Sequence, residues 1–189
     1  MSVKDTVNHR DALQNIGMFT LYGDIDEDTC KPAIEWLLYE NHIARPRRKE
    51  LIMLICSSGG DVEDAFALID VMMSSSIPIK TIGLGEVSSA GLMIFLAGTR
   101  GRRVLTPNTS VLSHQFSWST QGKAHELFAS IKEFQQAHDR MIQHYQQCLD
   151  MDARDIENIL LPPQDVWLTA QAALDLGICD YVSGITRDI

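Results

Sequence analysis

A six-residue apolar run, Leu51–Cys56, is followed by the turn sequence Ser-Ser-Gly-Gly and then by Asp61. A continuous apolar run of this length is typical of a parallel strand that is covered on both faces. Apolar residues then recur at helical spacing over residues 61–75, and acidic residues in the first turn favour the positive end of a helix dipole. A strand, a tight glycine turn and an amphipathic helix in this order indicate an α/β fold.

The rest of the chain continues this alternation of strands and helices. Alternating elements predict a mainly parallel, twisted sheet flanked by helices. The double proline at 162–163 stops a short helix, and Thr169 is placed to cap a last helix that ends at Gly177. Further strands are expected at residues 18–22, 77–84, 104–105, 111–113 and 178–182, and further helices at residues 28–42 and 88–97.

A much longer helical pattern covers residues 123–149, with apolar residues at Leu127, Ile131, Phe134 and Met141. At the rise of an α-helix this segment spans roughly 40 Å. A domain of this size does not need so long a helix. We therefore expect part of it to pack on another subunit.

Composition limits the class of protein. The chain has 189 residues, of which 45% are hydrophobic, and this suits one domain with a single large core. Its net charge of −9 argues against nucleic acid as a partner, because phosphate binding needs a basic face. The one basic cluster, at residues 45–49, lies between two periodic segments, and we interpret it as a solvated loop.

The apolar segments and the cysteines indicate a cytoplasmic protein. No stretch reaches the roughly 18 consecutive apolar residues that a membrane helix needs, and residues 1–15 lack the apolar region of a signal peptide. The four cysteines are scattered, so a disulfide framework or a zinc site is not expected. Cys56 and Cys179 lie in apolar runs and are expected to be buried thiols.

The segment Gly85-Glu-Val-Ser-Ser-Ala-Gly91 joins an expected strand to an expected helix. A serine at a helix N-terminus lies beside free backbone N–H groups, which stabilise the developing negative charge of acyl transfer. The flanking glycines let the backbone turn tightly and let a substrate approach. The alternative is an ordinary capping serine in a glycine turn. The pattern alone does not choose between Ser88 and Ser89.

A second turn of the same kind, Ser58-Gly59-Gly60-Asp61, also joins a strand to a helix. The carboxyl ends of parallel strands meet at one crevice, where ligands bind. We therefore expect this turn to face the serine turn. The alternative is a glycine turn that only caps the following helix.

His114 and Asp165 are candidates for the base and acid that a serine nucleophile requires. His114 follows the expected strand 111–113, and imidazole has a pKa suited to accepting the hydroxyl proton. Asp165 would orient the imidazole and stabilise its charged form. The alternatives are a structural histidine and a loop aspartate. The other five histidines are expected to be exposed: His9, His42, His125, His138 and His144.

Together these segments resemble the Clp protease proteolytic subunit (ClpP) family of serine peptidases, which is related in fold to the crotonases. The family carries its nucleophile in Gly-x-Ala-Ala-Ser-Met-Gly, and residues 85–91 take that place, with Ser89 as the serine. The family's Met-Ile-His-Gln-Pro element corresponds to residues 112–116. Its acid and the aromatic stretch that follows correspond to residues 165–170, and its Ser-Pro-Gly-Gly turn corresponds to residues 57–60.

The resemblance implies a ClpP/crotonase-like fold and a catalytic triad of Ser89, His114 and Asp165. It also implies that the backbone amides of Gly60 and Ala90 bind the oxyanion. The implied activity is that of a serine endopeptidase that hydrolyses peptides and unfolded proteins inside a ring chamber. No metal or organic cofactor is implied.

The resemblance also implies an assembly. Family members form heptameric rings, usually stacked as tetradecamers, and work with an AAA+ unfoldase or with related Clp subunits. Any dependence on ATP then belongs to the partner. Residues 18–189 would be the peptidase domain, with residues 123–149 as the handle helix that joins the rings. Residues 1–17 would be a short axial segment.

Several residues depart from the family pattern. Val87 replaces a small alanine beside the nucleophile, and Ser113 and Phe116 replace an apolar residue and a proline around the histidine. Gln164 stands where the family often has an arginine that links rings. The departures at Val87 and Phe116 keep open the alternative of a non-catalytic Clp-like structural ring subunit. A crotonase-type acyl-CoA enzyme, which shares the fold and the oxyanion chemistry, is a second alternative.

Overall fold

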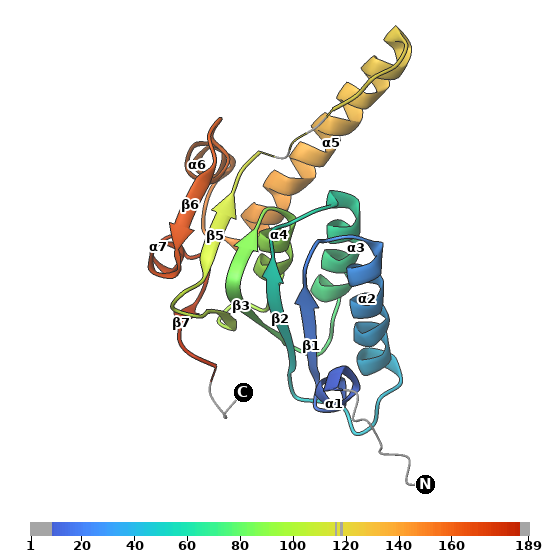
Figure 1. Ribbon diagram of the computed structural model, residues 1–189, viewed down its shortest axis with the longest axis vertical. Coiled ribbons are helices and arrows are strands. Elements are labelled where there is room, and N and C mark those ends of the chain that lie inside the picture. Colours follow the sequence, from blue (N-terminus) through green and yellow to red (C-terminus); the bar gives the residue numbers. More distant parts are fainter. Residues whose placement is uncertain (1–8, 116, 118, 186–189) are drawn as a thin grey trace, which may run out of the picture.

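The computed structural model describes residues 9–115, 117 and 119–185. Within them, one sheet has the strand order β1-β2-β3-β4-β7, and β5 pairs with the end of β3 and with β6 (Figure 1). All these pairs are parallel except β5–β6, so the predicted α/β fold with a mainly parallel sheet is confirmed. The strands are β1 (Met18–Tyr22), β2 (Leu51–Ser57), β3 (Ile79–Ser88), β4 (Arg103–Leu105), β5 (Ser110–Ser113), β6 (Val166–Thr169) and β7 (Tyr181–Val182).

Several helices begin where the sequence supplies a capping side chain. The Asp26 carboxylate accepts from the Thr29 amide to cap α2, and the predicted cap Thr169 accepts from the amide of Ala172 in α7. The helices are α1 (His9–Asn15), α2 (Glu27–His42), α3 (Val62–Met73), α4 (Ala90–Leu96), α5 (Ala124–Cys148), α6 (Ala153–Asp155), which continues into a π-helical turn over Ile156–Leu160, and α7 (Ala170–Asp175).

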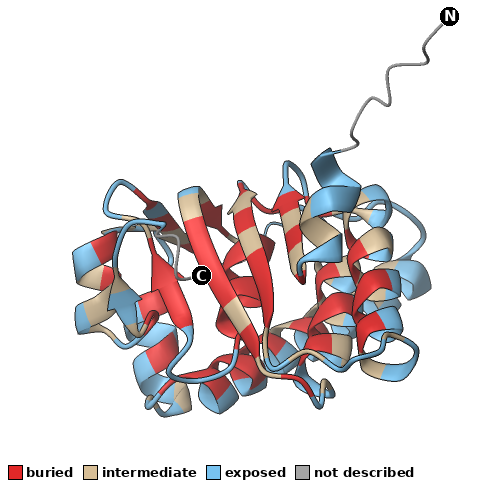
Figure 2. Ribbon diagram, turned by 90° about the horizontal axis from the view of Figure 1, so that it is seen from below, coloured by how far each residue is buried: buried red, intermediate tan, exposed pale blue. Residues whose placement is uncertain are grey.

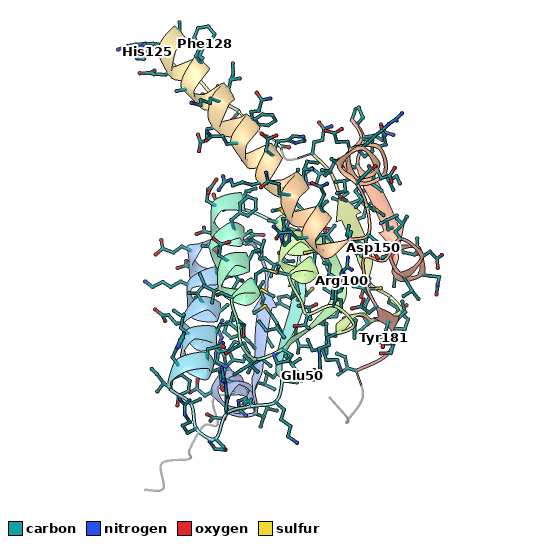
Figure 3. All side chains as sticks on the ribbon, turned by 180° about the vertical axis from the view of Figure 1, so that it is seen from behind. Glu50, Arg100, His125, Phe128, Asp150 and Tyr181 are labelled. Carbon is teal, nitrogen blue, oxygen red and sulfur yellow. The ribbon has the colours of Figure 1, made fainter. Side chains whose placement is uncertain are left out.

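The core lies between the sheet and the helices α2–α5, which gather on one face (Figures 1 and 3). Figure 2 shows the buried residues running along the strands and along the helix sides that face them. Successive strand residues point to opposite faces, so Ile52, Ile82 and Val104 form a second, smaller cluster on the other face. The apolar run of β2 suggested a strand that is covered on both faces. Leu54 and Cys56 are only half-buried, so one face of β2 is covered less than the other.

The long helix α5 lies within one residue of its predicted ends and spans about 37 Å. Its first half projects beyond the layers of the domain (Figures 1 and 3). Phe128 is 73% exposed near the tip, whereas the buried residues of the helix begin only at Ala137. The projecting half therefore presents apolar side chains that the described residues do not cover.

Several elements differ from the sequence-based expectations. Helix α1 was not expected, because none of its residues is buried and its sequence has no apolar periodicity. It packs beside β1, where the Arg10 guanidinium lies 5.7 Å from the centre of the Phe19 ring. Strand β6 was not expected either. Strand β3 was expected to end at residue 84 but continues to Ser88, because Gly85, at φ 68°, lets the strand bend and continue. The proposed boundary between residues 17 and 18 stays a prediction.

Three burial expectations are wrong. The Cys56 thiol is half-buried because its side chain points to the less covered face of β2, whereas Cys179 is buried as predicted. His144 is only 5% exposed, because it lies on the helix face that packs against the core, and His138 on the same helix is half-buried rather than exposed. Among the described residues, no helix is both long and apolar enough to cross a membrane.

Candidate active site

Ser89 occupies the junction between β3 and α4 in a strained backbone conformation. Its φ of 54° and ψ of −123° make it the only non-glycine residue with positive φ in the described part of the chain. In α/β-hydrolases the nucleophilic serine occupies a sharp, strained strand-to-helix turn, which presents the hydroxyl to the substrate. The strain at Ser89 therefore marks a candidate functional position.

The two neighbouring serines have different environments. Ser88 is fully buried, and its Oγ donates to Glu86 Oε1 at 2.9 Å. Ser89 is half-buried, and its side chain makes no capping hydrogen bond to α4. The structure thus separates two residues that the sequence pattern left equivalent, and Ser89 is the serine whose hydroxyl remains available.

The Gly59-Gly60 turn packs directly against Ser89, as the convergence of strand ends predicted. A Cβ on Gly59 would lie 2.6 Å from Ser89 Cβ, and one on Gly60 would lie 2.2 Å from the carbonyl oxygen of Ile25. The Ile25 amide donates to the Gly59 carbonyl at 2.9 Å, and the Asp61 amide donates to the Ile25 carbonyl at 2.7 Å. Only glycine fits both positions, at φ of 104° and 151°.

Two backbone amides beside Ser89 are free to bind an anion. In the described residues, neither the Gly60 amide nor the Ala90 amide donates to a backbone carbonyl. The Ser89 amide, by contrast, donates to the Leu112 carbonyl at 2.9 Å and is not available. The free amides are the two to which the resemblance assigned the oxyanion.

His114 and Asp165 each lie one residue beyond the last pair of the antiparallel ladder β5–β6. Ser113 pairs with Val166 at the end of this ladder, so continuing the register by one residue places His114 opposite Asp165. The same end of β5 lies beside Ser89, whose amide bonds to Leu112. The structure therefore brings the three predicted backbone positions to one end of β5.

The structure records no direct link between the three described side chains. Within the described residues, no hydrogen bond joins the side chains of Ser89, His114 and Asp165. His114 is half-buried and Asp165 is exposed. Catalytic hydrogen bonds in ligand-free enzymes are often long and tighten only when substrate binds. Of the departures from the family, Gln164 is exposed, and Phe116 lies outside the described residues.

A cavity of about 270 Å³ opens beside the Gly60 amide. Its wall combines apolar side chains from α3 and α5 with carboxylates, so it suits a side chain more than a whole small-molecule cofactor. Its lining residues are Gly60, Asp61, Val62, Glu63, Ser117, Glu133, Phe134 and Ala137.

A larger cavity of about 800 Å³ lies at the opposite end of the strands, near Glu50 and Tyr181 (Figure 3). It adjoins none of the predicted site residues, so size alone does not identify the functional site. In the described ranges, no three His, Cys, Asp or Glu side chains gather as a metal site.

Sequence reasoning assigned no role at the site to two buried polar residues that lie behind it. His144 Nε2 lies 2.8 Å from the Met93 carbonyl oxygen in α4, and burial lowers the pKa of this histidine. The Tyr145 hydroxyl lies 3.4 Å from Ser113 Oγ in β5, and burial raises the pKa of this tyrosine to about 12. The spacing of Ala137, Met141 and His144 on one helix face is the signal from which the burial of His144 could have been predicted.

Comparison with known proteins assigns the family. A family model described as Clp protease matches residues 3–186. The ATP-dependent Clp protease proteolytic subunit 2 of Thermobifida fusca is 31% identical over 169 residues, which cover 87% of this chain and 79% of that protein. The proteolytic subunit 2 of Treponema denticola is 27% identical over 190 residues, which cover 98% of this chain and 93% of that protein. Because the family match spans nearly the whole chain, this protein belongs to the Clp protease family.

Proposed function

We propose that this ClpP-type peptidase is a serine endopeptidase with Ser89 as nucleophile, His114 as base and Asp165 as the residue that orients His114. The observation that carries the proposal is the backbone of Ser89, the one described non-glycine residue with positive φ, which lies against the Gly59-Gly60 turn. Strain of this kind persists where the surrounding structure holds a residue for function.

The proposed reaction proceeds in two acyl-transfer steps. The Ser89 hydroxyl attacks the peptide carbonyl while His114 accepts its proton, and the amides of Gly60 and Ala90 donate to the oxyanion. His114 then protonates the leaving amine, which departs and leaves an acyl-enzyme. Water next attacks the acyl group with His114 again as base, and the acid product leaves as the serine hydroxyl re-forms.

The substrate we propose is an extended peptide or an unfolded protein. An extended chain can add to an exposed strand edge through main-chain hydrogen bonds, which tolerate many sequences. The cavity beside Gly60 is in reach of a side chain next to the scissile bond. The Thermobifida fusca relative is named as part of an ATP-dependent protease, which supports an AAA+ unfoldase or related Clp subunits as partners here.

The assembly we propose is a heptameric ring, stacked as a tetradecamer, in the cytoplasm. The projecting half of α5 supports it, because Phe128 and Ile131 are 73% and 50% exposed there. Apolar side chains on a projecting helix are typical of a subunit contact. Analytical ultracentrifugation of the full chain tests this, and a monomer under all conditions would exclude the ring.

Labelling with a fluorophosphonate probe, followed by mass-spectrometric mapping, tests the nucleophile. We expect modification at Ser89 in the wild-type protein and none in Ser89→Ala. Ser88→Ala is the matched control, because it removes the neighbouring buried hydroxyl and should keep the label on Ser89. Absence of labelling in every assembly state would instead favour a non-catalytic Clp-like structural ring subunit.

A further inference from the structure

The buried end of α5 contacts both elements that carry the proposed nucleophile and base. Its first half projects away from the domain, and its last turns pack into the core behind the site (Figure 3). Two polar residues on this buried surface, His144 and Tyr145, are neighbours in the sequence and are 5% and 1% exposed. Each of them bonds to a different element of the site.

His144 holds the nucleophile helix α4. Its Nε2 donates to the Met93 carbonyl at 2.8 Å, and Met93 in turn donates its own amide to the Ser89 carbonyl at 3.2 Å. One residue of α4 therefore connects the imidazole of α5 to the backbone of Ser89. Because α4 is a single buried segment, a shift at Met93 is transmitted to the Ser89 turn.

Tyr145 holds the strand that leads to the proposed base. Its hydroxyl lies 3.4 Å from Ser113 Oγ, and Ser113 immediately precedes His114 at the end of β5. Both side chains are buried, and in the described residues neither hydroxyl has a second hydrogen-bond partner. Removing one hydroxyl therefore leaves the other unsatisfied, and β5 loses its polar contact with α5.

We propose that His144 and Tyr145 are positioning residues that set the distance between Ser89 and His114 from behind the site. Their Cα atoms are held about 3.8 Å apart by one peptide unit in a rigid helix. The two contacts therefore place the nucleophile helix and the base strand relative to a single rigid support. This inference rests on the proposed function, since it concerns the same serine and histidine.

The Tyr145–Ser113 contact is tested by a double-mutant cycle in the full-length assembly. We expect Tyr145→Phe and Ser113→Ala each to lower kcat and the rate of fluorophosphonate labelling about tenfold at unchanged KM, since misplaced reacting groups slow the chemical step. The double variant should be no slower than the slower single variant, because the hydroxyls act as a pair. If the rate losses of the two single variants multiply in the double variant, or if the single variants react within twofold of the wild-type rate, the proposed pairing is overturned.

The His144 contact is tested by a loss variant and a conservative variant. His144→Leu keeps the volume but removes the donor, and we expect kcat about tenfold lower. His144→Gln can place an amide donor near the position of Nε2, and it should recover kcat to within about threefold of wild type. Equal rates for the leucine and glutamine variants would overturn the role of this hydrogen bond.

Thr109→Val is the matched control for loss of a buried hydroxyl. Thr109 is 2% exposed and donates to the Gly83 carbonyl at 3.0 Å, away from the ends that carry Ser89 and His114. It should lower the melting temperature while leaving kcat unchanged. A wild-type protein without label at Ser89 would overturn the proposed function and this inference together. A labelled wild type with unaffected variants would overturn only the positioning role.

Discussion

The close contact between Gly59 and Ser89 predicts that a side chain at position 59 displaces the proposed nucleophile. Substituting Gly59→Ala adds one methyl group to the turn that packs on the proposed nucleophile. That Cβ would lie 2.6 Å from Ser89 Cβ and 3.1 Å from the Ser88 carbonyl oxygen. Real Cβ atoms are in ordinary contact only from 3.4 Å, so the turn and Ser89 must separate by about 0.8 Å.

The size of the effect follows from this displacement. A misplacement of about 1 Å at a reacting group costs about 10²-fold in rate, so we expect fluorophosphonate labelling and peptide hydrolysis to fall roughly 50- to 100-fold. Alanine at the φ of Gly59 also strains the backbone, which costs about 1–3 kcal/mol of stability. Labelling kinetics and thermal unfolding of the same samples separate the two effects.

Gly23→Ala is the matched control for the backbone strain. Gly23 has φ of 105°, almost equal to the 104° of Gly59, but a Cβ there would meet nothing within 4 Å. The two variants should therefore lose similar stability, and only Gly59→Ala should lose activity. If Gly59→Ala reacts at the wild-type rate, or if Gly23→Ala is equally impaired in catalysis, the steric reasoning is refuted.

Three further predictions concern stability, measured by thermal or urea unfolding at fixed protein concentration. Asp180→Asn should destabilise the protein by about 3 kcal/mol, because the buried Arg103 guanidinium, now bonded to both Asp180 oxygens, loses its counter-charge; an unchanged melting temperature would contradict this. Burial alone would raise the pKa of Asp180, but hydrogen bonds and charge from Arg103 outweigh it and lower the pKa. The stability that Asp180 contributes is therefore fully present above its unfolded-state pKa of about 4, and it is lost as the pH falls through the lower folded-state pKa. The difference in unfolding free energy between wild type and Asp180→Asn should shrink below about pH 4, and a wider difference there would contradict this reasoning. Thr169→Ala should cost about 1 kcal/mol, because the Ala172 amide loses its capping acceptor, while Thr169→Ser should cost much less.

Elements with strong local signals could be predicted closely from the sequence. Strand β1 has the predicted bounds Met18–Tyr22, and α5 differs from its predicted range by one residue at each end. Apolar periodicity determines such segments, because one face must be buried whatever the partner is. Helix α1 and strand β6 were missed, since α1 buries no residue and β6 is stabilised by pairing with a strand more than fifty residues earlier in the chain.

The candidate site shows the same division between local and long-range information. The glycines around residues 59–60 and 85–91 and the polar residues at strand ends are visible in the sequence, because tight turns need glycine wherever they occur. The choice of Ser89 over Ser88 depends on φ and on burial, which strand pairing and helix docking decide. The burial of His144 likewise depends on which face of α5 meets α4.

By itself, the sequence determined the order of most elements, the mainly parallel sheet, the long helix and the set of candidate residues. Those properties follow from local conformational preference and from the periodicity of apolar side chains, which act over one element at a time. Only the tertiary structure decided that Gly59 packs on Ser89, that Ser113 pairs with Val166, and that neighbouring residues of α5 contact both α4 and β5. Each of these contacts joins residues far apart in the chain, and their distances exist only once the sheet register and the packing of α5 are in place.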